Sequence, residues 1–338
     1  MNRYQYFAVA LLALFHSSDA QCQPSRTRIS GTYKNGQGQI CSGDLILSDN
    51  FKNLDQRLWN HELTVDGNGN GEFQQYVNDR SISFVNRGKL IIRPKVVGNV
   101  PLNNGYFNPV QSARMTTAGR FAFTYGILET RAKLPAGDWL WPAIWLLAQD
   151  RNYGGYPHSG EIDLMESRGN KNLYAWGKKI GTQEVSSTVH FGQTYSQVDL
   201  GFLAHNEPGF DEAFHVYKLI WTPDYIAFFV DGRETGRVTP TNGGFYELGR
   251  LSGNNPFAGA TKMAPFDKDF YLLINVAVGG TGGYFPDKCV NPNGKPWKSS
   301  SPNAARDFWN GRWQWRPTWN EGTRQRALQV DYVKVWAL

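Results

Sequence analysis

The 338-residue chain has no hydrophobic stretch that could cross a bilayer as a helix, which takes ~20 apolar residues. The run Phe7–Phe15 is uncharged and apolar but far too short. It follows Arg3 and precedes small residues ending at Ala20, which is the pattern of a secretory signal peptide. We therefore predict a signal peptide over residues 1–20, a secreted mature protein over 21–338, and no membrane partner.

Cysteine is scarce, since only Cys22, Cys41 and Cys289 are present. The chain has no C-x-x-C pair and no Cys/His set with zinc spacing, which argues against a structural zinc site. In a secreted chain these cysteines favour a disulfide. Either Cys22 pairs with Cys41 and leaves Cys289 free, or Cys41 pairs with Cys289, because the sequence does not fix the connectivity. An N-x-S/T acceptor is also missing, so N-glycosylation is not expected.

Charge is not concentrated in any segment. The formal net charge is +6, and the basic residues are interleaved with acidic ones rather than gathered in a block. Recognition of nucleic acid depends on a basic patch or stripe, so a nucleic-acid partner is not supported.

Long helical patterns are absent, whereas aromatic residues and glycine are abundant, with 12 Trp, 16 Tyr, 20 Phe and 36 Gly. Short alternating or apolar runs between turn residues predict strands near residues 90–93, 125–133, 141–147, 161–166, 188–191, 215–221, 225–230, 270–278 and 328–336. Hairpin turns such as Asp231-Gly232 predict an all-β fold, an antiparallel β-sandwich of one domain with an aromatic-lined concave groove. Residues 281–325 are rich in Trp, Pro and Gly, and we predict an irregular segment that walls one end of the groove.

One predicted strand carries three carboxylates. The sequence from Gly160 to Glu166 reads G-E-I-D-L-M-E. Glu161 and Asp163 are two residues apart, so they face the same side of a strand, and the apolar residues between them face the other side. Glu166 comes one residue later than the next position on the acidic side. A β-bulge would return Glu166 to that side, and we predict one here.

Carboxylates that share one face repel one another, which raises the pKa of at least one of them. One can then stay ionised as a nucleophile while another holds a proton as a general acid, and retaining glycosidases place such a pair about 5–5.5 Å apart. Clustered carboxylates also suit Ca²⁺, but Ca²⁺ loops are built from turn residues and glycine rather than from an apolar strand. We therefore assign the three acids to catalysis, and we predict no metal site and no cofactor; a structural Ca²⁺ would have no acidic loop to hold it.

These motifs resemble glycoside hydrolase family 16, the β-jelly-roll glucanases. The segment Glu161–Glu166, with Met165 as the extra residue, is similar to the bulged motif of the laminarinase branch, which cleaves internal β-1,3 bonds. Weaker similarities follow in the family's order, at Ser112–Arg114, Tyr125–Lys133, Trp141–Leu147, Asn275–Gly280, Gly294–Trp297 and Val330–Trp336. The last two resemble invertebrate β-1,3-glucanases and β-glucan recognition proteins.

The resemblance implies roles for individual residues. Glu161 would be the nucleophile, Glu166 the general acid and later the base, and Asp163 a hydrogen-bonding partner of the nucleophile, in a retaining two-step reaction. The substrate-binding residues that it suggests are Trp141, Trp145, Arg114, His190, Asn275, Asn70 and Glu72. Four of them also have a purely structural interpretation, namely core packing for Trp145, a surface ion pair for Arg114, a satisfied core histidine for His190 and a sheet-end cap for Asn275.

Three functions are compatible with the resemblance. The first is a secreted, monomeric, retaining endo-β-1,3-glucanase acting on laminarin-type or microbial cell-wall glucans, in digestion or in defence. The second is a recognition protein of innate immunity, which binds β-1,3-glucan but typically lacks one or both catalytic glutamates and often has an extra N-terminal domain. The third is a glucan transglycosylase, which would use the same acids. Both glutamates are present and only residues 21–45 precede the first sandwich strand, so we predict the glucanase.

Overall fold

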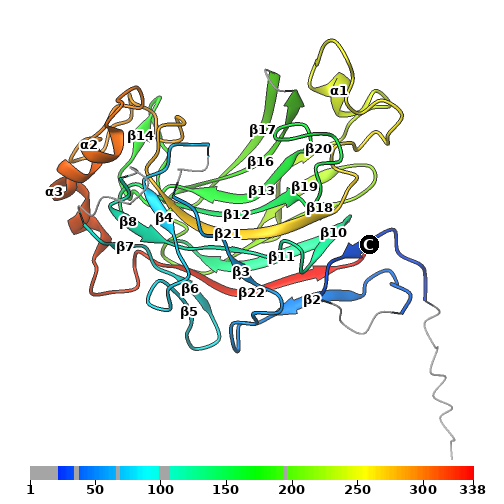
Figure 1. Cartoon of the computed structure of the whole chain (residues 1–338), viewed down its shortest axis with the longest axis horizontal. Coiled ribbons are helices and arrows are strands. Elements are labelled where there is room, and N and C mark those ends of the chain that lie inside the picture. Colours follow the sequence, from blue (N-terminus) through cyan, green and yellow to red (C-terminus); the bar gives the residue numbers. More distant parts are fainter. Residues whose placement is uncertain (1–21, 34–37, 66–68, 99–106, 194–195) are drawn as a thin grey trace, which may run out of the picture.

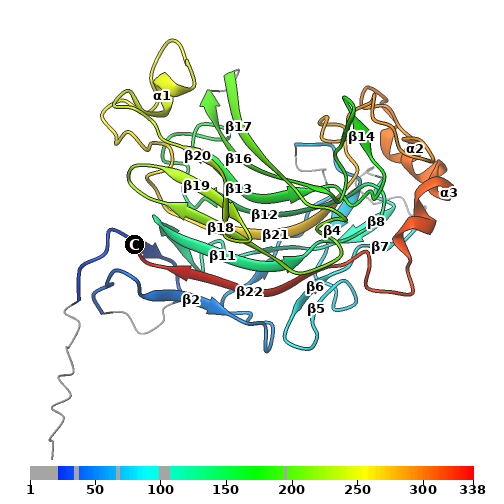
Figure 2. The same ribbon diagram turned by 180° about the vertical axis from the view of Figure 1, so that it is seen from behind.

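Two curved antiparallel sheets stacked face to face form the protein, as the computed structural model shows for residues 22–33, 38–65, 69–98, 107–193 and 196–338 (Figures 1 and 2). This architecture confirms the predicted antiparallel β-sandwich. The predicted signal peptide, residues 1–20, lies outside the described residues. Among the residues that are described, no helix is long and apolar enough to span a membrane.

The inner, concave sheet has nine strands. In spatial order these are β1 (Arg28–Ser30), β10 (Ala122–Thr124), β21 (Phe270–Val278), β12 (Leu140–Ala148), β13 (Glu161–Ser167), β16 (Glu184–Gln193) and β17 (Ser196–His205), and β9 (Arg114–Thr116) pairs with β21 and with β3 (Asn60–His61). The acid-bearing strand β13 therefore lies well inside this sheet, between β12 and β16.

The outer, convex sheet has eight strands. Their order is β20 (Arg233–Val238), β19 (Ile226–Val230), β18 (His215–Trp221), β11 (Gly126–Lys133), β22 (Leu328–Trp336), β6 (Leu90–Ile92) and β5 (Ser83–Val85), with β2 (Leu45–Asp49) on β22. Every strand predicted from the sequence has a counterpart in one of the two sheets, and the predicted Asp231-Gly232 turn joins β19 to β20.

The core lies between the sheets and is made by alternate residues of their strands. Ile144 on β12, Ile162 on β13 and Ile274 on β21 are fully buried, as are Leu128 and Leu219 of the facing sheet. Burying a side chain of this size contributes about 1.5–3 kcal/mol. Because successive residues of a strand face opposite sides, burial of Ile162 fixes Glu161 and Asp163 on the concave side.

Smaller elements stand at both ends of the inner strands (Figures 1 and 2). The helix α1 (Gly244–Leu248) lies at one end, and the hairpin β14 (Tyr174–Ala175) and β15 (Lys178–Lys179) lies at the other with α2 (Ala304–Asn310), α3 (Arg312–Trp315) and the 3₁₀ helix η1 (Arg316–Trp319). A three-stranded sheet of β4 (Gln74–Tyr76), β8 (Val110–Ser112) and β7 (Lys95–Val96) completes the fold. The prediction that residues 281–325 are irregular is therefore wrong in part, since buried aromatic side chains hold three short helices there.

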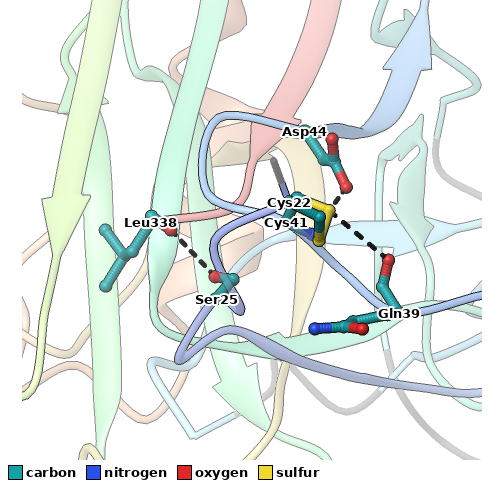
Figure 3. Close-up of a disulfide and its surroundings, with 6 residues drawn as sticks. All are labelled: Cys22, Ser25, Gln39, Cys41, Asp44 and Leu338. Atoms are coloured by element: carbon teal, nitrogen blue, oxygen red, sulfur yellow. Dashed lines mark hydrogen bonds between the residues drawn. A yellow bond between two sulfur atoms is a disulfide. The ribbon is translucent and has the colours of Figure 1, made fainter. Parts of the chain in front are cut away.

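A disulfide between Cys22 and Cys41 ties down the N-terminal arm, and Cys289 is free (Figure 3). This is one of the two pairings that the sequence allows. Beside it, the Ser25 hydroxyl donates to the carbonyl of Leu338 at 2.9 Å, so the arm is also bound to the chain's last residue.

Candidate active site

The three acids lie together on β13, on the concave side of the inner sheet. Asp163 is buried at 3% exposure, whereas Glu161 and Glu166 are half-buried. Ligand atoms of Glu161, Asp163 and His190 lie within 4.8 Å of one another. Side chains in this position are shielded from bulk water and still accessible from the concave face.

The predicted bulge is confirmed and lies between Asp163 and Glu166. In the register against β12, Asp163 and Met165 each have a partner and Leu164 has none. Against β16, the bulge leaves Leu164 and Met165 opposite the single position of Ser187. The extra residue relative to β12 is therefore Leu164 rather than the predicted Met165. Both side chains are buried, and the bulge turns Glu166 back to the acidic side.

A cation stands beside the acids. His190 on β16 is paired with Glu161 in the register, and its Nε2 lies 2.7 Å from Asp163 Oδ2. On its other side His190 Nδ1 lies 2.7 Å from Asp199 Oδ1, to which Gln197 also donates at 2.7 Å. Burial opposes the charge on His190, but Asp163 and Asp199 outweigh it and raise the pKa of His190 to about 11.

The two glutamates hold their protons more tightly than ordinary carboxylic acids do. Burial first, and then the charge of Asp163, raises the pKa of Glu161 well above its usual value. The same two causes raise the pKa of Glu166 to about 7, although His190 and a hydrogen bond from Trp141 act in the opposite direction. A carboxyl group with a pKa near 7 is suited to act as a general acid at neutral pH.

Trp141 fixes the orientation of Glu166. Its Nε1–H donates to Glu166 Oε1 at 2.8 Å, and its ring stacks on Tyr284 with centroids 3.8 Å apart and planes 4° from parallel. Arg168 covers the other side of Tyr284, with its guanidinium 4.1 Å from the ring centre. Trp141 is only 8% exposed. Its contact with the acid is therefore better supported by the geometry than an open stacking face for a sugar.

The predicted binding residues Trp145, Asn275 and Arg114 belong to one hydrogen-bonded network. Trp145 is half-buried, and its Nε1–H donates to Asn275 Oδ1 at 2.7 Å. Asn275 donates in turn to the Tyr76 hydroxyl at 3.1 Å, and Arg114 donates to the same hydroxyl at 3.4 Å. Asn275 lies inside β21 and is no sheet-end cap. Arg114 does form an ion pair, with Glu62 at 3.4 Å, but it is buried rather than at the surface.

Glu72 extends this network, and Asn70 lies at its edge. Glu72 is buried, and burial raises its pKa even though Arg114 lies 3.8 Å away. It accepts hydrogen bonds from Gln74 at 2.5 Å and from Asn70 at 3.5 Å. Glu72 is thus a support for the network rather than an open contact, whereas Asn70 is exposed.

Comparison with known proteins identifies the family of this chain. A model of glycosyl hydrolases family 16 matches residues 71–246, which include the bulged strand and His190. This chain belongs to glycosyl hydrolase family 16. The comparisons thereby confirm the resemblance drawn from the sequence.

The relatives within family 16 include both binding proteins and enzymes. The chain is 40% identical to a beta-1,3-glucan-binding protein of Penaeus monodon, over 87% of this chain and 90% of that protein. It is 36% identical to the glucan endo-1,3-beta-glucosidase A1 of Niallia circulans, over 73% of this chain and 36% of that protein. Among solved structures, the catalytic domain of an endo-1,3-beta-glucanase (laminarinase) from Thermotoga petrophila superposes with a TM-score of 0.62 at 28% identity, covering 87% of this chain and 97% of that one.

Several residues of this family 16 site were not found from the sequence. Asp199 reaches His190 from β17, Gln197 on the same strand donates to Asp199, and the hydroxyl of Tyr156 bonds to Gln197. Burial, and then the charges of nearby acids including Glu161, raises the pKa of Tyr156. Asp199 stands directly opposite His190 in the register between β16 and β17. Recognising these two strands as one hairpin in the sequence would have placed Asp199 beside His190.

Glu161, Asp163 and His190 are also the one group of side chains, within the described part of the chain, that could together hold a metal ion. Their ligand atoms lie within 4.8 Å of one another. A metal needs the neutral imidazole, whereas His190 lies in ion-pair contact with two carboxylates that favour its protonated form. The arrangement therefore fits a charge-balanced acid cluster better than a metal centre.

Proposed function

We propose that this family 16 protein is a secreted, monomeric, single-domain endo-β-1,3-glucanase that works by the retaining mechanism. The observation that carries the proposal is the complete set of acids on the bulged strand, with Asp163 between Glu161 and Glu166, Trp141 bonded to Glu166 and His190 paired with Asp163. The β-1,3-glucan substrate is supported by the names of the relatives on both the binding and the enzymatic side.

In the first step, Glu166 donates its proton to the glycosidic oxygen while a carboxylate oxygen of Glu161 attacks the anomeric carbon. The bond to the leaving sugar breaks and a covalent glycosyl ester forms on Glu161. The hydrogen bond from Trp141 orients Glu166 toward the leaving oxygen. A pKa of about 7 means that Glu166 is mostly protonated in weakly acidic solution, as this step requires.

Glu161 must be ionised to attack. Burial and the charge of Asp163 raise the pKa of Glu161, and the positive charge of His190 acts in the opposite direction and favours the ionised form. The cationic His190 beside Asp163 limits the negative charge of the cluster. In the second step, Glu166, now ionised, takes a proton from water, whose oxygen attacks the anomeric carbon and releases Glu161.

A β-1,3-glucan-binding protein without hydrolytic activity is the second candidate, and the similarity to named relatives favours it more than the enzyme. The Penaeus monodon protein covers nearly the whole chain and is named for binding. Both candidates share the ligand and differ only in whether the bond is cleaved. A transglycosylase would form the same glycosyl ester and pass it to a sugar hydroxyl instead of water.

The proposal is tested by incubating the purified protein with laminarin and measuring new reducing ends, beside Glu161→Gln and Glu166→Gln variants. Release of short oligosaccharides by the unmodified protein alone is the expected result. Absence of release, together with retention on insoluble β-1,3-glucan, would replace the enzyme by the binding protein. Longer products without new reducing ends would indicate transglycosylation.

A further inference from the structure

The segment after β21 presents one tryptophan to solvent while it buries others. Trp313 in α3 is 72% exposed, and within the described residues its ring has no stacking, cationic or hydrogen-bonding partner. Trp297, Trp315 and Trp319 of the same segment are buried. The exposure of Trp313 is thus specific to this residue and does not reflect loose packing of the segment.

The backbone beneath Trp313 is firmly anchored. Trp315 stacks on Phe308 with ring centroids 4.3 Å apart, and its Nε1–H donates to the Phe308 carbonyl at 2.9 Å. Trp319 contacts Trp315 at 4.9 Å and donates from Nε1 to the Asp138 carbonyl at 2.9 Å. A ring presented on so rigid a base loses little conformational freedom when a ligand binds.

Trp313 borders a surface groove of about 550 Å³ that is also lined by Pro317 and by four polar side chains, those of Asn310, Arg312, Arg316 and Glu321. Arg316 and Glu321 line it and neutralise each other, with Arg316 Nε 2.9 Å from Glu321 Oε1. Arg312 is held over Trp309, with its guanidinium 4.6 Å from the ring centre and a 3.2 Å hydrogen bond to the Trp309 carbonyl. An aromatic face beside the paired Arg316 and Glu321, with the hydrogen-bonding groups of Asn310 and Arg312, suits a ligand without charge that carries many hydroxyl groups.

We infer that this groove is a second binding site for a neutral glucan, separate from the acids; the inference rests on the proposed function, because its ligand is the same polymer. The apolar face of a pyranose ring would stack on Trp313, and Asn310, Arg312 and Glu321 would reach its hydroxyls. The groove volume lies within the ~300–1,000 Å³ of ligand sites. The helix α3 stands at the outer margin of the molecule, away from the concave face (Figures 1 and 2). Insoluble glucan offers many chains, so one protein molecule can bind it through both sites at once. The two contacts together retain the protein more strongly than either contact alone.

The test is retention on insoluble β-1,3-glucan, measured in a Glu161→Gln background so that the ligand is not consumed. Trp313→Ala is expected to weaken retention roughly tenfold through lost avidity. Trp313→Phe, which keeps an aromatic face, is expected to restore most of it. Trp176→Ala is the matched control, since Trp176 is 80% exposed at the tip of the β14–β15 hairpin and does not line the groove.

Equal retention of the Trp313→Ala variant and its parent would overturn the inference and leave the proposed function intact. Equal loss in the Trp176→Ala control would also overturn it, because the effect would then be general aromatic adhesion. If the parent itself were not retained and the unmodified protein did not cleave laminarin, both the inference and the proposed function would fail.

Discussion

At the scale of single residues, the site depends on two glutamates in different surroundings. Glu166 receives a hydrogen bond from Trp141, whereas Glu161 lies beside the charge of Asp163. His190 sets the charge of the whole group, because its two ring nitrogens lie 2.7 Å from Asp163 and Asp199. Trp141 and His190 can each be replaced without removing an acid, which separates their effects in a pH profile.

Trp141→Phe removes the hydrogen bond to Glu166 and keeps the stacking on Tyr284. The lost bond stabilised the ionised form, so the pKa of Glu166 rises above its value of about 7. The alkaline limb of kcat/KM against pH, measured on laminarin, should therefore move to higher pH. Trp145→Phe is the control, because Trp145 donates to Asn275 instead. An unmoved limb in Trp141→Phe, or the same movement in the control, would contradict this account of the acid.

His190→Asn removes the cation beside the acids. Since His190 lowers the pKa of both Glu161 and Glu166, its loss should raise both, and the acidic limb of kcat/KM should move to higher pH. The matched control is His215→Asn, because His215 also lies 2.7 Å from an aspartate, Asp231, but on β18 in the other sheet. A parallel shift in both variants would show that the effect is not local.

At the scale of elements, the bulge in β13 decides which carboxylates meet. The alternation of Glu161, Ile162 and Asp163 predicted the strand and its two faces, and the late position of Glu166 predicted the bulge. The short helices α2 and α3 could not be predicted in the same way, because buried contacts such as that between Phe308 and Trp315 hold them rather than any local periodicity.

The non-local part of the site was also beyond prediction. The network around Tyr76 joins β4, β9 and β21, which are far apart in the sequence. The alternation in a single sequence predicts the two faces of each strand but not the register between distant strands. For this reason Arg114 and Asn275 were suggested by family resemblance, while Tyr76, Glu62 and Gln74 were missed.

Exchanging the last two residues of the acidic motif, in the double variant Met165→Glu and Glu166→Met, tests the bulge. Met165 is fully buried, so a glutamate there would be an uncompensated charge in the core. We expect unfolding free energy to fall by about 3 kcal/mol or more and activity to fall roughly 10²–10⁴-fold from loss of the general acid. Thermal unfolding and laminarin hydrolysis measure the two effects. Glu166→Gln is the control and should lose activity without the loss of stability; an active, stable double variant would disprove the bulge.

At the scale of the whole molecule, the acids and the N-terminal arm are separate. The arm contains β1, which pairs with β10 at one edge of the inner sheet. Its Ser25 is hydrogen-bonded to Leu338, the last residue of the chain. The acids lie within that sheet, between β12 and β16. The groove beside Trp313 is lined by residues of α2, α3 and η1 and by Glu321.

Removal of the disulfide by Cys22→Ser and Cys41→Ser tests that separation. Closing a loop with a sequence separation of 19 residues is expected to stabilise the folded state by about 3 kcal/mol at most. The double variant should unfold at a lower temperature yet cleave laminarin at the unmodified rate at 25 °C. Thiol titration of the unfolded, unreduced protein should find Cys289 alone. A large loss of rate in the folded variant would show that the arm acts on the site.

The central claim is that Glu161 forms a covalent bond to the sugar, and one measurement addresses it directly. The protein is incubated with a 2-deoxy-2-fluoro laminaribiosyl fluoride, whose glycosyl ester hydrolyses slowly, and the adduct is located by mass spectrometry of its peptides. The account predicts one laminaribiosyl adduct, on Glu161, that is absent from the Glu161→Gln variant. An adduct on Glu166, or no adduct on a protein that still binds β-1,3-glucan, would contradict it.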